Sequence, residues 1–422
     1  MLYSSKKMTL AVLFGSIFSL NSCKENEFLQ PKESIKTNQT SSFETPGDFA
    51  AGGFNHTVFA NKIEAKLDGV VPGYSYCIIK NGQVVVQKGK GSARYPVDVP
   101  SRSYSNNEIQ DIGSVSKFMT ALLAMKLLDR TGLPINTALE NKVYLYMPSY
   151  FNASNDFKKV TFRHLLAHTS GIINNGSDIE DIESTVEDGI NETTDANPLV
   201  SPKPYGQYDY QNINYVMLRY AIVYLAASKS KTIADDLTIG SNPVYYDKYN
   251  LNVKISTWFR KLLREEIFQP ALIPDWNLID FKSWGIADNQ KVKYYNFVNS
   301  PVAGYDSGDH LIGAAGAGGL KMSARQIAQV VGAARAGLII KPSLFTKMKT
   351  GDGFFNQIGF DEGITAVHGK YYHKNGSGAG NAILLDFDGE GVNVQLAITT
   401  NMTGTEVTSP QTWATLFDQS WQ

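Results

Sequence analysis

The chain has 422 residues, of which 43% are hydrophobic, and this is enough for one large domain or two interlocked ones. Its 39 Lys and Arg residues against 40 Asp and Glu residues give a formal net charge of -1 at pH 7. A chain with so little net charge has no positive electrostatic field that would attract a polyanion, so we do not expect nucleic acid as a partner.

The first 22 residues have the pattern of a bacterial lipoprotein signal peptide. Two lysines precede a mostly apolar run over 8–20, which is too short to span a bilayer permanently. The run ends in Leu20-Asn21-Ser22-Cys23, which resembles a lipobox, where the Cys is acylated. Because Asn21 is not the commonest residue there, ordinary signal-peptidase cleavage and an incidental Cys23 thiol are the alternatives. We expect residues 1–22 to be removed and Cys23 to anchor the protein to a membrane of the cell envelope, periplasmic or at the cell surface.

A flexible tether is expected over 23–52, ahead of one folded domain over 53–422. The tether is rich in Lys, Glu, Ser, Thr, Asn and Gln, and it has too few large apolar residues to offset the entropy of ordering. Besides Cys23, the chain contains only Cys77, in an apolar stretch. No internal disulfide and no cysteine-based metal site are therefore expected.

The domain is predicted to begin with a helix and a hairpin. We expect a helix over 54–67, followed by two strands over 74–80 and 84–90. The strands flank Asn81-Gly82, which is a strong signal for a two-residue hairpin turn.

The end of the chain carries a second predicted hairpin. Its strands are expected over 382–388 and 392–400, and a C-terminal helix is expected from Pro410. The segment between the hairpins is mainly helical, with helices expected near 115–130, 161–168, 212–227, 255–267 and 323–336. This order predicts an α/β (α+β) fold, in which an antiparallel sheet from both chain ends is flanked by helices and an inserted region is mainly helical.

Ser114 and Lys117 form an S-x-x-K motif at the predicted start of a helix. A Lys placed three residues after a Ser lies on the same helix face, where its amine can take the hydroxyl proton. Unpaired N–H groups at the helix start favour the negative charge that develops on an attacked carbonyl, so the Ser114 N–H can be half of an oxyanion hole.

The same motif occurs at Ser4 and at Ser228, so its context has to distinguish the three. Ser4 lies in the predicted signal peptide, and Ser228 closes an apolar helix where Lys231 is interpreted as a solvated terminal charge. Ser114 instead opens a helix whose apolar residues recur at helical spacing. We therefore predict Ser114 as the nucleophile and Lys117 as its activating partner.

Residues 161–172, TFRHLLAHTSGI, resemble the T-hydrophobic-x-x-L-L-x-H-T-S-G signature of class C β-lactamases and their relatives among penicillin-binding proteins, D-alanyl-D-alanine carboxypeptidases and esterases. This resemblance implies the β-lactamase/transpeptidase-like fold and a serine acyl-enzyme that needs no cofactor. His164 and His168 could alternatively be zinc ligands, but no Glu base lies between them and no third ligand is evident. We expect no metal and a turn beside the active site.

The resemblance extends over about 54–420. It includes the segments 259–272 and 316–328, both of which are similar to landmarks of the family. Residues 229–254 have no family counterpart that we can place, and they are interpreted as an insertion.

The second family motif, Y-x-N, occurs four times, beginning at Tyr104, Tyr150, Tyr210 and Tyr294. Only Tyr210-Gln211-Asn212 continues as the family does, with Tyr215 and Leu218 on the next helix. By resemblance, Tyr210 shares the proton transfer with Lys117, and the Asn212 amide positions Lys117 and a substrate amide. A tyrosine packed at a helix start is the alternative.

The third family motif, K-T-G, is spelled out by Lys349-Thr350-Gly351, at the end of a predicted helix that starts at Pro342. There Gly351 is expected to be a helix C-cap and Lys349 a charge in the last turn. We therefore look for the motif elsewhere.

Lys374-Asn375-Gly376 leads into the strand at 382–388 and resembles the family's K-T-G or H-x-G. By resemblance, Lys374 attracts a substrate carboxylate and Gly376 lets the substrate backbone approach, while the Ser377 N–H is the second oxyanion donor. Asn375 in place of Thr or Ser departs from the β-lactamase pattern and argues against efficient antibiotic hydrolysis.

Taken together, these residues predict a serine hydrolase that acts through a Ser114 acyl-enzyme on D-alanyl peptides, β-lactams or esters. The alternative from another class is a penicillin-binding receptor or scaffold without turnover.

Overall fold

The computed structural model describes residues 53–172, 179–188, 204–283, 286–351, 357–389, 391–403 and 409–422. The predicted signal peptide, Cys23 and the tether lie outside the described residues. Within the described ranges, no helix combines the length and apolar character that crossing a membrane would require.

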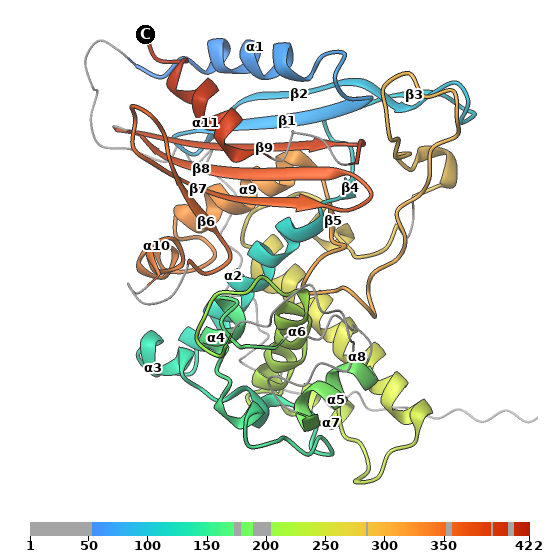
Figure 1. Ribbon diagram of the computed structural model, residues 1–422, viewed down its shortest axis with the longest axis vertical. Coiled ribbons are helices and arrows are strands. Elements are labelled where there is room, and N and C mark those ends of the chain that lie inside the picture. Colours follow the sequence, from blue (N-terminus) through green and yellow to red (C-terminus); the bar gives the residue numbers. More distant parts are fainter. Residues whose placement is uncertain are drawn as a thin grey trace, which may run out of the picture.

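A seven-stranded sheet forms one half of the molecule, with the strand order β3-β2-β1-β9-β8-β7-β6 (Figure 1). Every pair in it is antiparallel, and the contact between β1 and β9 joins the two ends of the chain. The predicted sheet is thereby confirmed. Its strands are β1 (Gly73–Lys80), β2 (Gln83–Arg94), β3 (Arg102–Ser103), β6 (Asp361–Ile364), β7 (Lys370–Ser377), β8 (Asn381–Gly389) and β9 (Val392–Thr400).

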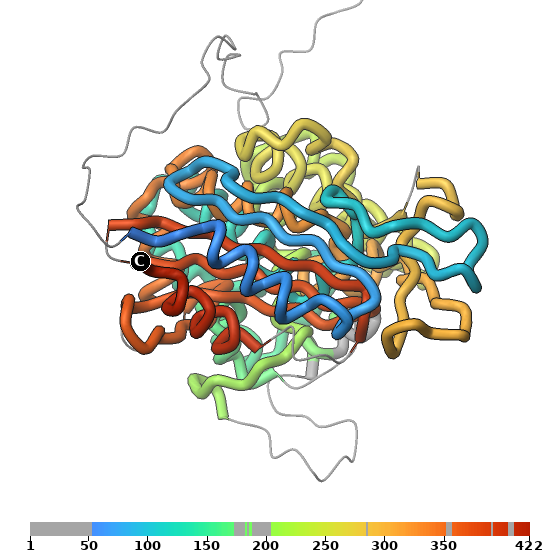
Figure 2. Tube along the Cα trace, turned by 90° about the horizontal axis from the view of Figure 1, so that it is seen from above, coloured from blue at the N-terminus to red at the C-terminus, as the bar shows by residue number. Residues whose placement is uncertain are grey.

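The outer face of the sheet is covered by α1 (His56–Leu67) and α11 (Pro410–Asp418), which lie side by side across the strands (Figure 2). The side chain of Asn55 caps α1 by accepting hydrogen bonds from two backbone N–H groups. Phe417 of α11 stacks on Phe387 of β8 with ring centroids 4.1 Å apart. The termini therefore share one hydrophobic core above the sheet.

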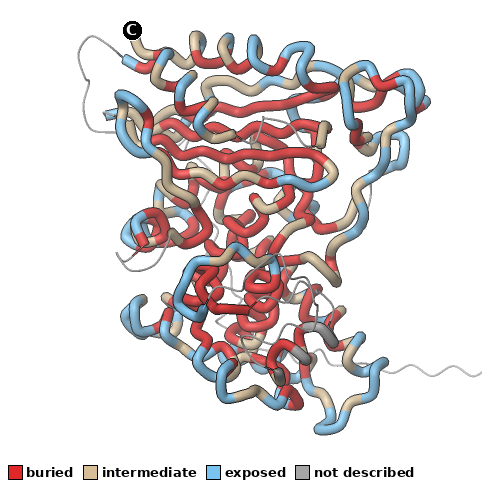
Figure 3. The backbone as a smooth tube through the Cα atoms, viewed as in Figure 1, coloured by how far each residue is buried: buried red, intermediate tan, exposed pale blue. Residues whose placement is uncertain are grey.

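The inner face of the sheet packs against α9 (Ala324–Arg335), below which lies the inserted helical region (Figure 1). Burial on both faces explains why the central strands are continuous apolar runs. Two helices of the inserted region are buried along nearly their whole length, as the red segments in Figure 3 show. These are α2 (Ser116–Asp129) and α6 (Asn212–Ala227).

The remaining helices surround α2 and α6. One difference from the sequence prediction is α8, which starts at Tyr245 rather than near 255 and ends at Leu263, where a π-helical turn follows. Its first turns are largely polar and bury few side chains, so their apolar periodicity is weak. These helices are α3 (Ile135–Leu139), α4 (Phe162–Leu166), α5 (Ile179–Asp188), α7 (Lys231–Asp236) and α8 (Tyr245–Leu263), whereas α10 (Pro342–Thr350) packs against α9.

The helix α10 ends at Thr350, and Gly351 adopts a φ of 63°, so the literal K-T-G is a helix end as expected. Lys349 lies in the last turn as expected, but it makes contacts that the sequence did not indicate. Its side chain is buried, and its Nζ lies 3.2 Å from the Asp386 carboxylate and also contacts Asp388. Lys349 therefore ties α10 to β8.

Lys349→Ala is expected to lower the free energy of unfolding by about 3 kcal/mol, because it leaves the buried Asp386 with one cation fewer. Urea unfolding measures this change. The exposed pair between Lys341 and Asp129 provides the control, since Lys341→Ala should cost less than about 1 kcal/mol. If Lys349→Ala instead left stability unchanged and reduced turnover, the active-site strand would have to be sought at 349–351.

Candidate active site

Ser114 lies where the inner face of the sheet meets α2. It follows β4 (Gln110–Asp111) in a 3-10 turn, Gly113–Val115, that leads directly into α2. The turn is held from both sides, because the Gly113 N–H donates to the Asp111 carboxylate at 2.8 Å and the Gly113 carbonyl accepts from the Ser116 hydroxyl at 2.7 Å. The nucleophile predicted from the sequence thus sits on a fixed backbone.

The structure brings Ser114, Lys117 and Tyr210 together. Lys117 Nζ lies 3.0 Å from Ser114 Oγ, and the Tyr210 hydroxyl donates to the same Oγ at 2.8 Å. Ser228, the competing serine, donates to a helix carbonyl at 2.7 Å, and Lys231 is exposed and paired with Asp235.

The Lys117 amine has two further partners, the Asn212 side-chain oxygen and the Ala317 carbonyl, each at 2.7 Å. A neutral amine has two N–H donors and one lone pair. The two acceptors can take both donors, so the lone pair is left facing Ser114 Oγ. The family landmark at 316–328 therefore has a specific contribution, the carbonyl of Ala317.

Burial lowers the pKa of Lys117 well below its usual value, and the positive charge of Lys374 lowers it further. Its side chain is fully enclosed, and no carboxylate of the described residues lies within ion-pair distance of it. The neutral amine that a base requires is thus favoured by the surroundings.

Burial raises the pKa of Tyr210 to about 12, although its hydrogen bond to Ser114 opposes the rise. At neutral pH the phenol keeps its proton and acts as a donor. The His168 ring lies tilted against the Tyr210 ring at 4.5 Å, and burial lowers the pKa of His168. The neutral imidazole therefore packs against the Tyr210 ring without placing a charge beside it.

The other three Y-x-N tyrosines lie elsewhere. Tyr104 donates to Gln110, Tyr294 accepts a hydrogen bond from the Asp111 N–H, and Tyr150 packs on Phe151. All three are buried. Only the continuation of the motif into the next helix distinguished Tyr210 from them in the sequence.

The histidines of TFRHLLAHTSGI serve local structure. Nδ1 of His164 accepts from the Thr161 N–H at 3.2 Å, and Nδ1 of His168 accepts from the Gln211 N–H at 3.3 Å. Among the described residues, no group of three or more His, Cys, Asp or Glu side chains is arranged to hold a metal ion.

The backbone of strand β7 packs directly against the backbone of the turn Gly113–Val115, which carries Ser114. A Cβ added to Gly376 would come within 2.7 Å of the Ser114 N, and one added to Gly113 would come within 2.8 Å of the Ser377 N. Only glycine allows this approach. It places the N–H groups of Ser114 and Ser377 on adjoining segments, as an oxyanion hole requires.

Lys374 is also at the site, with its Nζ 4.9 Å from the centroid of the Tyr210 ring. The sequence did not indicate its partner, Asp361 of β6, whose carboxylate lies 3.0 Å from that Nζ. The charge expected to attract a substrate carboxylate is therefore already paired.

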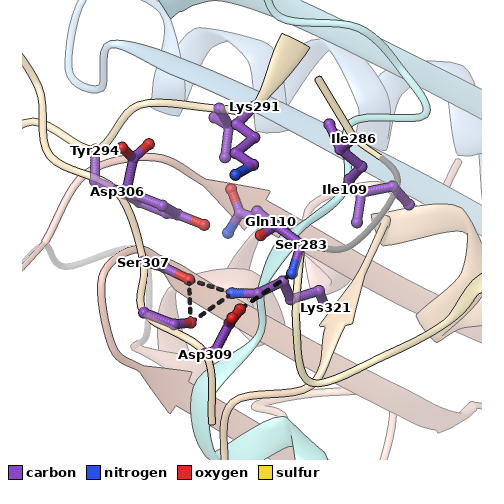
Figure 4. A pocket seen from close by; sticks show the side chains of 12 residues that line it. Ile109, Gln110, Ser283, Ile286, Lys291, Tyr294, Asp306, Ser307, Asp309 and Lys321 are labelled. Atoms are coloured by element: carbon purple, nitrogen blue, oxygen red, sulfur yellow. Dashed lines mark hydrogen bonds between the residues drawn. The ribbon is translucent and has the colours of Figure 1, made fainter. Parts of the chain in front are cut away.

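Two further residues escaped the sequence analysis. Asp111, which holds the Gly113 N–H, is buried, and its other oxygen lies 3.3 Å from Nε2 of His310. Gln110 and Asp309, the chain neighbours of these two residues, line a separate cavity of about 230 Å³ (Figure 4). There Lys321 donates to Ser307 and to the Gly308 carbonyl, which fastens the loop that carries His310. The two hydrogen-bond partners of Ser114 described above, Lys117 and Tyr210, are not among the residues that line this cavity.

Comparison with known proteins places this geometry in context. A family model described as Beta-lactamase matches residues 59–419. Among curated relatives, Protein flp of Staphylococcus aureus is 33% identical over 154 residues, which are 36% of this chain and 29% of that protein. The chain thus matches less than a third of that relative's length.

Solved structures show the same fold at low sequence identity. FmtA from Staphylococcus aureus superposes with a TM-score of 0.62 and 17% identity, covering 90% of this chain and 92% of that one. An octameric penicillin-binding protein homologue from Pyrococcus abyssi gives 0.59 and 20%, covering 86% and 76%. The hydrolase EstCE1, which has promiscuous acyltransferase activity, gives 0.59 and 14%, covering 86% and 98%.

Proposed function

Because the chain belongs to the Beta-lactamase family, we propose that it is a serine hydrolase that forms an acyl-enzyme on Ser114. The contacts of Lys117 and Tyr210 with the same Ser114 oxygen carry this proposal. A base and a hydroxyl donor around one serine are the requirements of acyl transfer.

In the acylation step, the lone pair of Lys117 takes the Ser114 proton while Oγ attacks the substrate carbonyl. The carbonyl oxygen becomes an oxyanion, which accepts hydrogen bonds from the N–H groups of Ser114 and Ser377. Both N–H groups belong to backbone segments that pack closely against each other, so we expect this stabilisation to need little movement of the protein.

The tetrahedral intermediate collapses when the leaving group receives a proton. Tyr210 is the neutral donor nearest to Ser114 Oγ, and its ring lies 4.9 Å from Nζ of Lys117, which holds the transferred proton. We infer that the proton returns from Lys117 through Tyr210. Water then releases the acyl group by the reverse sequence of proton transfers.

The proposed substrates are D-alanyl peptides, β-lactams or esters. Similar folds include a D-stereospecific amidohydrolase from Streptomyces and EstCE1, a hydrolase with promiscuous acyltransferase activity, and both are compatible with acyl transfer at Ser114. The reaction at Ser114 requires only an acyl carbonyl and a leaving group that can be protonated, so the catalytic groups alone do not choose among these substrates.

The test is intact-mass measurement of the protein after exposure to a penicillin, a phenyl ester and a D-alanyl dipeptide, followed over time. A Ser114 adduct that forms and disappears with release of product is expected for an enzyme. A permanent adduct would identify a penicillin-binding receptor, and the absence of an adduct with all three compounds would refute the proposal.

We also propose that the mature protein is anchored to a membrane of the cell envelope by lipid on Cys23. The lipobox-like sequence before Cys23 and the polar segment after it support this. Expressed in full length, the protein should partition with membranes and carry the mass of acyl chains at its N-terminus. Cys23→Ala should release it, whereas Cys77→Ala should not.

A further inference from the structure

The ion pair between Asp361 and Lys374 places a carboxylate in the candidate active site. The Lys374 side chain is only 6% exposed, whereas that of Asp361 is 37% exposed. A molecule that arrives from solvent therefore meets the negative member of the pair first. The ammonium behind it is already engaged by Asp361 and by the face of the Tyr210 ring.

The position of the pair relative to Tyr210 indicates which part of a substrate it faces. In the proposed reaction the leaving group takes its proton from the side of Tyr210. The Lys374 Nζ lies 4.9 Å from the centroid of that ring, on β7, the strand that also carries Ser377. A substituent on the leaving group would therefore lie beside Asp361 and Lys374.

We propose that Asp361 makes this site select substrates whose leaving group bears an ammonium group, and that it disfavours leaving groups with a carboxylate. The inference rests on the proposed acyl transfer at Ser114 and narrows its substrates, because the leaving-group side of a D-alanyl-D-alanine peptide or a penicillin carries a carboxylate and would be disfavoured against an aminated ester or amide. The exposed Asp361 carboxylate attracts the ammonium group, while a carboxylate would have to displace Asp361 from Lys374.

The experiment uses three phenylacetyl esters that differ in one leaving-group substituent. Their phenols carry a 3-aminomethyl, a 3-methyl or a 3-carboxylate group, so the substituent is cationic, neutral or anionic at pH 7. Release of each phenol gives kcat/KM for the wild type and for each variant. Comparing the same ester between variants cancels its intrinsic reactivity.

Asp361→Asn keeps the shape of the side chain and removes its charge, which leaves Lys374 unpaired. The ratio of kcat/KM for the cationic ester to that for the anionic ester is expected to fall on the order of 10- to 100-fold, because one charge at contact distance acts in opposite directions on the two esters. Any shift in the pKa of Lys117 acts equally on all three esters and cancels in the ratio, and the change in kcat/KM for the neutral ester shows that shared effect by itself.

Two further variants keep the test decisive. Glu362→Gln removes the next carboxylate on β6, which pairs with Lys370 at 2.9 Å, and it should leave the ratio unchanged. In the double variant Asp361→Asn/Lys374→Gln both charges are gone, and the ratio should approach that of the alkaline hydrolysis of the two esters. Thermal unfolding of each variant shows whether it is folded.

The inference is overturned if the ratio in Asp361→Asn stays within twofold of wild type, or if Glu362→Gln shifts it as much. It is also overturned if the wild type prefers the anionic ester beyond its intrinsic reactivity. A failure of the proposed acyl transfer at Ser114 would give a different result. In that case even the neutral ester would form no Ser114 adduct in the intact-mass measurement, and the proposed charge selection would be refuted as well.

Discussion

Ser114→Ala is expected to reduce turnover of any ester or β-lactam substrate by a factor on the order of 10⁴ or more, because the hydroxyl is the proposed covalent centre. Folding should be unaffected, since the side chain is partly exposed and the turn is held by Asp111 and Ser116. The mass adduct with a penicillin or an ester should disappear together with turnover.

Ser228→Ala is the matched control, because Ser228 begins the other S-x-x-K sequence of the domain and its hydroxyl donates to the Leu225 carbonyl. This variant should retain wild-type turnover. The assignment of the nucleophile would be contradicted if Ser228→Ala abolished turnover while Ser114→Ala retained it.

Lys117→Arg is expected to lower kcat/KM by about 10²- to 10⁴-fold, the usual contribution of a general base. A guanidinium stays protonated at every accessible pH and cannot take the Ser114 proton. Lys231→Arg, at the equivalent position of the Ser228 sequence, is the control and should behave as wild type, because Lys231 is exposed and paired with Asp235.

The pH dependence follows from the same amine. Protonation of Lys117 removes its lone pair, so activity should fall as the pH decreases through its lowered pKa. The groups that face Lys117 are the cation of Lys374, the carboxylate of Asp361, the phenols of Tyr210 and Tyr215, and the neutral ring of His168.

Two charge changes should therefore move the acidic limb of the pH profile in opposite directions. Lys374→Met removes a like charge, which raises the pKa of Lys117 and moves the limb to higher pH. Asp361→Asn removes an opposite charge, which lowers that pKa and moves the limb to lower pH. Profiles of kcat/KM against pH for the neutral ester measure both shifts. If the midpoint of the acidic limb were the same in both variants as in the wild type, Lys117 would be ruled out as the titrating base.

The fold could be predicted closely because its signals are local. The hairpin at Asn81-Gly82, the C-terminal hairpin and the helix over 212–227 were all recognisable from a few consecutive residues, and the structure has them. The start of α8 was missed because its first turns carry a weak apolar pattern.

Some contacts of the candidate active site could also be predicted from residues that are close together in the sequence. Ser114 and Lys117 are one helical turn apart, so their contact is encoded by spacing alone. Tyr210 and Asn212 were recognisable because their motif continues into the following helix. The sequence by itself therefore determined the family and the order of its motifs, and it predicted Ser114 as the nucleophile.

The tertiary structure decided what surrounds these residues. Ala317 reaches Lys117 across 200 positions of sequence, and Asp361 reaches Lys374 from a neighbouring strand at the edge of the sheet. Lys349, which the sequence indicated only as a charge in the last turn of a helix, is buried because β8 brings two carboxylates to the end of α10. Such contacts depend on how strands and helices are arranged in space. The charges that set the pKa of Lys117 and the polarity of the substrate site therefore follow from the sheet topology, which no local pattern of residues contains.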